Sequence, residues 1–351
     1  MKASYQRFIL NFKREAKTSR GTLIQKKTYL FLIQKENQIG YGECAVFRGL
    51  SIDDVPNYEQ KMAWVCHHIN IGKEKLLAQL IDFPSIQFGL EQAFLSLNAS
   101  NPFELFPSKF TESKDQILIN GLIWMGTPSY VKQQIEDRIK EGFTTIKMKI
   151  SALNFQSELS IIESIRKKYS AKEITLRLDA NGAFTPEMAI QKLDELAKFD
   201  IHSVEQPIKQ HQHNEMEKLC RNSPIPIALD EELIGVFKKQ EKQQLLEKIK
   251  PQYLILKPSL LGGIKGCNEW IELAEKLQID WWITSSLESN LGLNALAQWT
   301  YTLQKNATHG LGTGSLFTNN FSCPLKIKDG ILCVKKDVKW QKSEFDEFFK
   351  I

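Results

Sequence analysis

The chain has 351 residues, of which 42% are hydrophobic and 25% charged, and its formal net charge is +5. This composition is that of an ordinary globular protein, and the length suggests one large domain with a smaller one. The excess lysines are spread over helix-like stretches without interleaved aromatic residues, so nucleic acid is not an expected partner.

The sequence also argues against a membrane or secreted protein. Its six cysteines form no CxxC pair, and no apolar run approaches the roughly 18 residues of a spanning helix. The N-terminal segment MKASYQRFIL is too short and too polar for a targeting segment. We therefore expect a cytoplasmic protein with reduced cysteines and no membrane partner, and nothing in the sequence specifies its oligomeric state.

The first hundred residues predict a separate α+β domain over residues 1–105. The stretches YQRFILNF and TYLFLIQKENQIGYGECA have the pattern of antiparallel strands, and helical patterns follow near residues 57–70 and 84–97. The polar segment 98–110 reads as the linker to the next domain.

From residue 117 to residue 314, strand-like and helix-like segments alternate at a steady pitch. This alternation predicts a (β/α)7β TIM-like barrel over residues 106–316, a barrel that lacks its last helix, with the first domain as a cap. The strand candidates start 24 to 31 residues apart and are 117–124, 144–150, 175–181, 202–207, 226–231, 253–258, 281–286 and 309–314.

The chain leaves this periodicity in a C-terminal tail over residues 317–351. Within it, residues 324–335 predict a β-hairpin that turns at Asp329–Gly330. We expect the tail to pack on the first domain and complete it.

Three acidic residues close three successive strand candidates: Asp179, Glu205 and Asp230, separated by 26 and 25 residues. Each alone would be an ordinary helix cap, although glutamate is a poor one. Three in succession fall at the barrel end where catalytic residues lie, and there they can hold a cation. Without an accompanying His or Cys, three oxygen ligands predict Mg²⁺ rather than zinc.

Lysines flank these acids. Lys147 and Lys149 share one face of a strand, and Lys257 follows a strand on the opposite side of the predicted barrel. Such a pair alone is typical of an exposed strand face, but parallel barrel strands have none, so the lysines must project into the mouth. There one lysine can take a proton α to a metal-bound carboxylate, and we expect neighbouring positive charge to lower a lysine pKa.

The motifs KMK, DAN, EQP, DE and LKP, in this order and spacing, resemble those of the enolase superfamily and, more narrowly, its muconate-lactonizing subgroup. TSSLESNLGLNALAQW (284–299) and GLGTGSLF (310–317) are similar to the o-succinylbenzoate synthase family within it. Dipeptide epimerases of the subgroup usually carry Asp-x-Asp at the end of the eighth strand, where this chain has GLGTG. The resemblance therefore implies a small anionic substrate without an ammonium group.

The resemblance implies a carbon–oxygen lyase of menaquinone biosynthesis. Such an enzyme converts 2-succinyl-6-hydroxy-2,4-cyclohexadiene-1-carboxylate to o-succinylbenzoate by syn dehydration, through an enediolate stabilised by Mg²⁺, for which Mn²⁺ can substitute. No organic cofactor is implied. By motif, Lys149 would abstract the α-proton and then protonate the departing hydroxyl, Lys147 would contact the metal-bound carboxylate, and Lys257 would stabilise the enediolate through a cation–π contact.

Substrate contacts are implied for Asn181, Ser286, the Gly312 region and Arg20, the last in a loop (18–21) that resembles the mobile loop closing the site. One alternative is N-succinylamino acid racemase, alone or as a second activity, which would use Lys149 and Lys257 as bases on opposite faces. A non-catalytic binding barrel is a further alternative, and the complete set of ligands and lysines argues against it.

Overall fold

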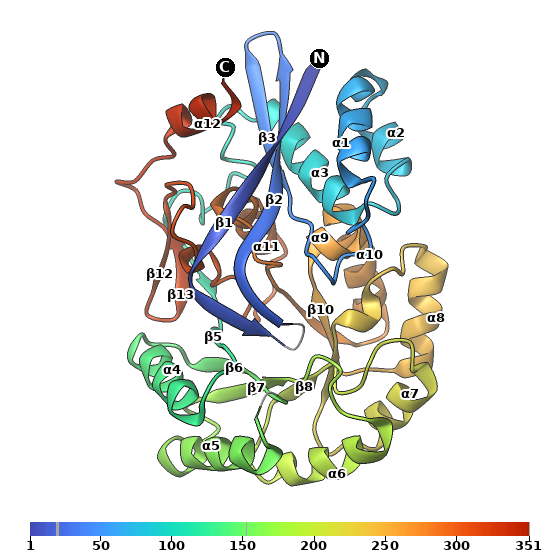
Figure 1. Cartoon of the computed structure of the whole chain (residues 1–351), viewed down its shortest axis with the longest axis vertical. Coiled ribbons are helices and arrows are strands. Elements are labelled where there is room, and N and C mark those ends of the chain that lie inside the picture. The colour runs from blue at the N-terminus through green and yellow to red at the C-terminus, as the bar shows by residue number, and fades with distance from the viewer. Residues whose placement is uncertain (19–20, 152, 351) are drawn as a thin grey trace.

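A computed structural model describes residues 1–18, 21–151 and 153–350 of the chain. It has an upper part built on an antiparallel sheet and a lower part built on a curled parallel sheet with helices around the outside (Figure 1). The expected α/β class is therefore confirmed. Among the described residues, every helix is too short or too polar to cross a bilayer.

The upper part comes from the first hundred residues. Its three strands pair antiparallel in the order β1-β2-β3, and the helices cover one face of this sheet. Its elements are β1 (Lys2–Thr18), β2 (Gly21–Lys35), β3 (Gln38–Cys44), α1 (Tyr58–His67), η1 (Ile69–Ile71), α2 (Lys73–Ala78) and α3 (Pro84–Asn98).

Strand β3 and helix α3 pack so closely that only glycine fits between them. A Cβ atom at Gly42 would lie 2.0 Å from the carbonyl oxygen of Gly89, and a Cβ atom at Gly89 would lie 2.3 Å from Sγ of Cys44. Both distances are far below van der Waals contact, so these glycines allow the two backbones to touch. The GYGEC segment is thereby fixed against α3.

The lower part is a parallel sheet of seven strands in the order β11-β10-β9-β8-β7-β6-β5. Apolar side chains of these strands and of the surrounding helices form the largest hydrophobic core. The strands are β5 (Gly121–Ile123), β6 (Thr145–Lys149), β7 (Thr175–Asp179), β8 (Ser203–Glu205), β9 (Ile227–Leu229), β10 (Tyr253–Leu256) and β11 (Asp280–Ile283). The helical elements are α4 (Pro128–Lys140), α5 (Phe155–Lys168), α6 (Pro186–Ala197), α7 (His213–Asn222), η2 (Glu231–Leu233), α8 (Lys239–Ile249), α9 (Pro258–Leu261), α10 (Gly263–Lys276) and α11 (Asn290–Thr302).

The two edges of this sheet meet at residues 309–310. His309 forms a parallel bridge with Ile119 near one edge, and Gly310 forms one with Thr284 at the other. The predicted strand 309–314 is reduced to these bridges, and its glycine-rich sequence, which is unfavourable for a strand, ends in the short helix η3 (Gly314–Leu316).

The C-terminal tail contains the predicted hairpin, formed by β12 (Leu325–Lys328) and β13 (Ile331–Val334). Asp329 and Gly330 both have positive φ, as a tight hairpin turn requires. The hairpin extends through the short strand β4 (Ile117–Leu118), which pairs with β13. The predicted strand 117–124 is thus divided between two sheets, as β4 and β5.

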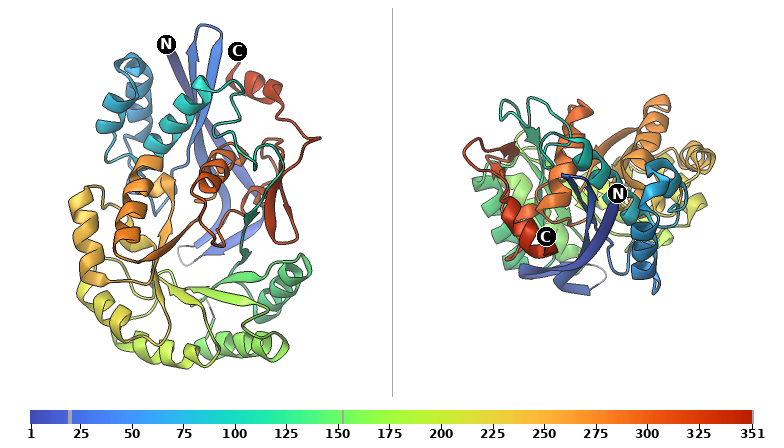
Figure 2. Two further views of the ribbon diagram at one scale, coloured as in Figure 1. Left: turned by 180° about the vertical axis from the view of Figure 1, so that it is seen from behind. Right: turned by 90° about the horizontal axis from the view of Figure 1, so that it is seen from above.

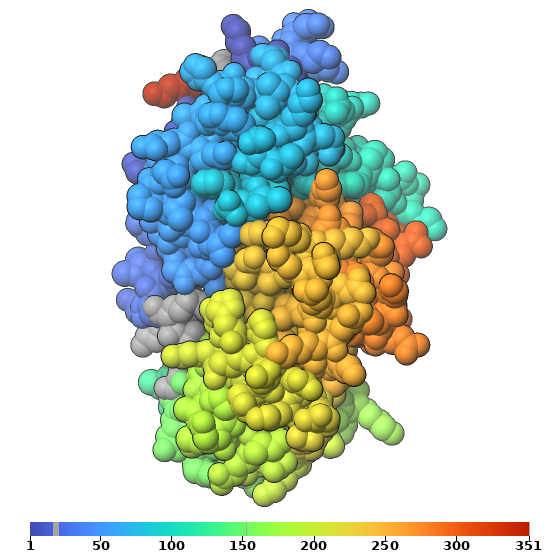
Figure 3. All heavy atoms as spheres, turned by 90° about the vertical axis from the view of Figure 1, so that its right-hand side faces the viewer, coloured from blue at the N-terminus to red at the C-terminus, as the bar shows by residue number. Residues whose placement is uncertain are grey.

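The last helix, α12 (Lys342–Phe349), returns to the upper part, so the two chain ends lie near each other (Figure 2). Its Phe345 is fully buried and packs against Tyr41 of β3 and Phe321 of the tail. In space-filling view, the first hundred residues also rest directly on the helices near residues 240–270 (Figure 3). One such contact joins Glu91 of α3 to the backbone N–H groups of Ile264 and Lys265.

The close approach of β3 and α3 generates a stability prediction. Gly42→Ala should destabilise the protein by about 1–3 kcal/mol, because the added methyl group forces two backbones apart. Thermal and urea unfolding would measure the loss. Gly312→Ala is the matched control, since its Cβ would meet nothing closer than 3.6 Å and should leave the unfolding midpoint unchanged. Equal midpoints for Gly42→Ala and wild type would contradict the packing argument.

Candidate active site

A cavity of about 100 Å³ opens at the C-terminal ends of the parallel strands. Both parts of the protein line it, because the segment after β3 contributes apolar side chains and the parallel sheet contributes polar ones. The lining residues include Phe47, Leu50, Asn120, Leu122, Trp124, Lys147, Lys149, Asp179, Asn181, Lys257, Thr284, Ser285, Ser286, Leu287, Gly310, Gly312 and Thr313.

Strand register brings the acids and lysines to one level. Lys149 of β6 pairs with Asp179 of β7, which in turn pairs with Glu205 of β8. Directly beyond these strands, Asn181 and Gln206 have positive φ values of 45° and 40°. Left-handed backbone at a residue other than glycine is uncommon and is concentrated at functional sites. These turns end each strand at the residue whose side chain faces the site.

The predicted lysines and acids form a network of ion pairs in two parts, one around Lys147 and Lys149 and one at Lys257. Lys147 Nζ lies 2.6 Å from Glu205 Oε2 and 3.1 Å from Asp179 Oδ2. Lys149 Nζ donates hydrogen bonds to Asp179 Oδ2 at 2.9 Å and to Asn181 Oδ1 at 2.8 Å. On the other side, Lys257 Nζ lies 2.5 Å from Asp230 Oδ2. Of the three acids, Asp179 lines the cavity, whereas Glu205 and Asp230 are not among the described residues that line it.

Burial and mutual charge set the pKa values in this network. Burial acts to lower the pKa of Lys257, but Asp230 and Glu205 outweigh it and the pKa is raised. At Lys257 the neighbouring carboxylates therefore outweigh both burial and the neighbouring cation Lys147. The expected lowering of the pKa of the proton-abstracting lysine stays a prediction. Burial likewise opposes the charged form of Asp179, yet Lys147 and Lys149 hold its pKa well below the ordinary value. Glu205 has a raised pKa, through burial and the nearby Asp179.

The donor set fits a hard divalent cation. Asp179, Glu205 and Asp230 are each at most 3% exposed, and oxygen is the only donor type that they offer. Burial and the neighbouring charges of Asp179 and Asp230 all raise the pKa of Glu205, so a bound cation would stabilise the ionised form of its carboxylate. Mg²⁺ and Mn²⁺ favour such oxygen ligands.

A second row of polar residues orients these acids, and the sequence did not reveal it. Gln206 accepts hydrogen bonds from the backbone N–H groups of Asp230 and Glu232 and donates to the Glu232 carboxylate. Asn181 donates to Glu231 at 3.0 Å while it accepts from Lys149. In the sequence, the signals for this second row of polar residues were the glutamine of the EQP motif, Gln206, and the second acid of the DE motif, Glu231.

The predicted substrate contacts differ in how far the structure describes them. Asn181, Ser286 and Gly312 all line the cavity, whereas Arg20 lies outside the described residues. The Ser286 hydroxyl is buried and has no hydrogen-bond partner among the described residues. A buried hydroxyl without a partner is costly, and a polar ligand in the cavity could satisfy it.

The apolar part of the cavity wall was not predicted. It consists of Phe47 and Leu50 from the upper part and Leu122, Trp124 and Leu287 from the lower part. Leu287 has φ of 63°, a rare conformation for a bulky residue. Apolar residues after a strand carry no signal that separates cavity wall from core, so only the three-dimensional structure identifies them.

Two buried charged residues anchor the upper sheet to this wall. The Glu43 carboxylate accepts hydrogen bonds from the Ser289 hydroxyl and from the backbone N–H groups of Ser289 and Gly292. It therefore binds the N-terminus of α11, where the helix dipole favours a negative charge. Lys26 Nζ donates to the carbonyl oxygen of Leu287 at 2.9 Å. The anchor thus ends at a residue of the cavity wall.

Comparison with known proteins identifies relatives that share the fold of this chain. Residues 130–337 match the family model described as enolase C-terminal domain-like. The chain is 41% identical to the o-succinylbenzoate synthase of Desulfotalea psychrophila over 365 aligned residues, which cover 95% of this chain and 99% of that relative. The chain belongs to the enolase superfamily.

Within the enolase superfamily, solved structures agree with this assignment. The crystal structure of MenC from Desulfotalea psychrophila LSv54 has a TM-score of 0.85 and 39% identity, covering 95% of this chain and 99% of that one. The muconate lactonizing enzyme from Pseudomonas putida has a TM-score of 0.79 at 18% identity, covering 99% and 98%, and supports the fold alone. The resemblance to o-succinylbenzoate synthase is therefore confirmed, and the chain is a homologue of that lyase.

The geometry predicts the effect of removing ligand charge. Asp179→Asn, Glu205→Gln and Asp230→Asn should each weaken Mg²⁺ binding and nearly abolish turnover, because an amide cannot replace the charge of a carboxylate ligand. Calorimetric titration with Mg²⁺ would measure binding, and circular dichroism would confirm that the fold is intact. Near-wild-type activity of any variant at low Mg²⁺ would remove that carboxylate from the ligand set.

Proposed function

We propose that the protein catalyses the syn dehydration of 2-succinyl-6-hydroxy-2,4-cyclohexadiene-1-carboxylate to o-succinylbenzoate in menaquinone biosynthesis. The observation that carries this proposal is the placement of Lys149 and Lys257 at one cavity, from opposite sides of three buried carboxylates. The homology to o-succinylbenzoate synthase over nearly the whole chain supports it.

Asp179, Glu205 and Asp230 are the residues that would hold the metal ion, which we propose to be Mg²⁺, with Mn²⁺ as a substitute. When bound, the ion acts as a Lewis acid that makes the proton α to the substrate carboxylate more acidic. Lys147, which already contacts two of these acids, lies where it can also contact that carboxylate.

The two remaining lysines have different roles in the proposed elimination. The neutral amine of Lys149 takes the α-proton, and the electron pair of the broken C–H bond is first delocalised onto the substrate carboxylate as an enediolate. That electron pair then forms the new ring double bond as the C–O bond breaks, and the hydroxyl group leaves as water with the proton that Lys149 carries. Lys257 stays charged throughout and stabilises the negative charge that develops on the substrate. Its raised pKa suits that role.

The remaining cavity residues fit a small anionic substrate. We propose that Asn181, Ser286 and the backbone near Gly312 contact it, with Arg20 as a further anion contact. The segment GLGTG brings no carboxylate to this wall, so a substrate ammonium group would lack a partner there. The Ser286 hydroxyl, which has no hydrogen-bond partner among the described residues, can bind the succinyl group or the ring substituents.

We infer that the lower part is a (β/α)7β barrel in which residues 309–310 occupy the position of the eighth strand. Residues 1–105 form the capping domain, residues 106–316 the barrel, and residues 317–351 a tail that packs on the cap. The bridges at His309 and Gly310 and the contacts of Phe345 support these bounds. The described cysteines are all free, which fits a reducing cytoplasm.

A second candidate activity is racemisation of an N-succinylamino acid. The placement of Lys149 and Lys257 on opposite sides of the site favours it, because racemisation needs one acid or base on each face of the substrate. The two activities differ in what they require of Lys257. Elimination needs only its charge, whereas racemisation needs its proton.

The variants Lys257→Arg and Lys149→Arg separate the two activities. Arginine keeps the positive charge but does not deprotonate near neutrality. Lys257→Arg should therefore reduce dehydration to a measurable rate and abolish racemisation. General acid–base catalysis supplies roughly a 10²- to 10⁴-fold acceleration. Lys149→Arg removes the base, so the rates of both reactions should fall by at least that factor.

The measurement is the rate of each reaction, with and without Mg²⁺, on the cyclohexadiene substrate and on an N-succinylamino acid. Mg²⁺ titration of both variants is the control, because the carboxylate ligands remain in place. Equal loss of dehydration in the two variants would contradict the assignment of a single base. Absence of dehydration in the wild-type protein with Mg²⁺ would contradict the proposed function.

A further inference from the structure

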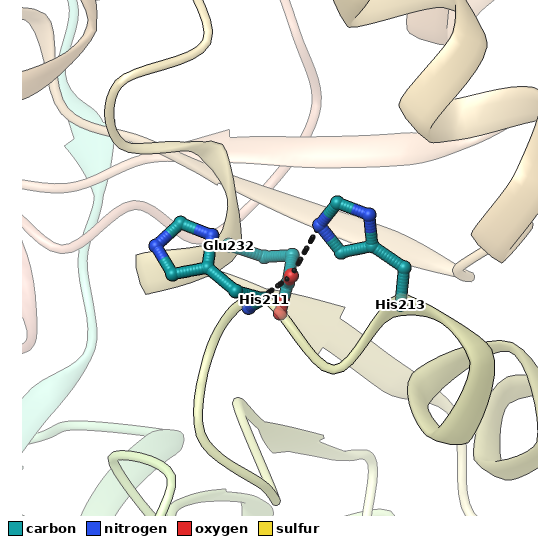
Figure 4. A group of neighbouring side chains, drawn as sticks. All are labelled: His211, His213 and Glu232. Atoms are coloured by element: carbon teal, nitrogen blue, oxygen red, sulfur yellow. Dashed lines mark hydrogen bonds and ion pairs between the residues drawn. The ribbon is translucent and has the colours of Figure 1, made fainter.

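Three potential metal ligands lie together outside the catalytic cavity: His211, His213 and Glu232 (Figure 4). Their ligand atoms all lie within 4.8 Å of one another. His211 lies in the segment between β8 and α7, His213 is the first residue of α7, and the glutamate comes from η2, directly after β9. The cluster therefore joins the loops that follow two neighbouring strands.

The Glu232 carboxylate is buried, although it offers two charged oxygens. The residue is 1% exposed. Its Oε1 accepts hydrogen bonds from the backbone N–H of His211 at 2.8 Å and lies 3.1 Å from His213 Nε2. Its Oε2 accepts from Gln206 Nε2 at 3.0 Å. Across the described residues, His213 is the sole basic side chain that forms an ion pair with it. No lysine or arginine among the described residues forms an ion pair with this buried carboxylate, so a bound cation would add the positive charge that its surroundings lack.

The two imidazoles are accessible from solvent. His211 is exposed, and His213 is 38% exposed in its side chain. His211 has φ of 70°, a left-handed conformation that turns the chain so that both rings lie beside the same carboxylate. Within the described part of the chain, the His211 ring forms no hydrogen bond. The ring is placed by its position beside the His213 ring and the Glu232 carboxylate.

We propose that His211, His213 and Glu232 form a second metal site, which binds a divalent transition metal ion of the zinc class. Two imidazoles and one carboxylate, with water completing the coordination, are a common ligand set for Zn²⁺. Imidazole ligands suit Zn²⁺, Co²⁺ and Ni²⁺, whereas the three carboxylates of the catalytic cavity suit Mg²⁺. The two sites are therefore distinguished by ligand chemistry.

The site lies one hydrogen bond away from the catalytic ligands. Gln206, which donates to Glu232, follows Glu205 in sequence and accepts from the backbone N–H of Asp230. An ion bound by His211, His213 and Glu232 would link the loop after β8 to η2. It would thereby stabilise the backbone that carries both acids, without contacting the substrate.

Binding of Zn²⁺ to the full-length protein in saturating Mg²⁺ tests the proposal. Competition with a chromophoric chelator should detect one Zn²⁺ site in wild type, and Zn²⁺ should raise the thermal unfolding midpoint. Loss of a residue that only hydrogen-bonds to a metal ligand lowers metal affinity about 10- to 100-fold. His211→Ala removes a ligand itself and should therefore weaken Zn²⁺ binding by at least that factor. This variant keeps the backbone N–H bond to Glu232, so it removes only the ring. Its midpoint without Zn²⁺ should equal that of wild type.

Two matched variants complete the experiment. His67→Ala removes an exposed histidine of α1 and should leave Zn²⁺ binding unchanged. Asp179→Asn alters the catalytic carboxylates and should also retain the Zn²⁺ site, even as Mg²⁺ binding is lost. Co²⁺ in place of Zn²⁺ should give visible absorption bands in wild type that disappear in His211→Ala. Wild-type Zn²⁺ affinity in His211→Ala, or loss of the site in Asp179→Asn, would overturn the proposal.

Discussion

The structure of the site depends on the balance of charge among three buried carboxylates and three lysines. Neither the carboxylates nor the lysines could be buried without the other group. Burial of a charged side chain without a partner costs about several kcal/mol of free energy, even after the surrounding protein adjusts. Each lysine of the cavity is therefore paired with an acid of a neighbouring strand, as Lys149 is with Asp179 and Lys257 with Asp230. The same pairing holds the pKa of Asp179 low and keeps the lysines positioned. Binding of a cation by the acids would then loosen their hold on the lysines, which links metal binding to the chemistry of Lys149.

The sequence was sufficient for the parts of the site that recur with the strand period. Asp179, Glu205 and Asp230 could be placed together because parallel strands end at one edge, and their spacing showed that successive strands carried them. Strand ends were less predictable. The segment 309–314 reads as a strand but contributes only bridges at its first two residues, since glycine-rich backbone forms few pleated contacts. Likewise, nothing local in the segment 117–124 marks the point at which the chain passes from one sheet to another.

The residues that escaped prediction act through contacts between distant segments. Gln206 and Glu232 are ordinary polar residues in the sequence, and only folding shows that Gln206 binds both the Glu232 carboxylate and the backbone of Asp230. Phe47 and Leu50 belong to the upper part of the protein but line a cavity of the lower part. The apolar pattern marks such residues as buried without saying whether they face the core or a ligand.

The anchor formed by Glu43 has a consequence for how the protein can change its specificity. Glu43 fixes the upper sheet to α11 through backbone donors and one hydroxyl, so the connection does not depend on the identity of the cavity wall. Phe47 and Leu50 follow only a few residues later and can be exchanged while the anchor holds the segment in register. The residues that would change with a new substrate are thus distinct from those that maintain the fold. In this segment, the division between the two groups falls between Glu43 and Phe47.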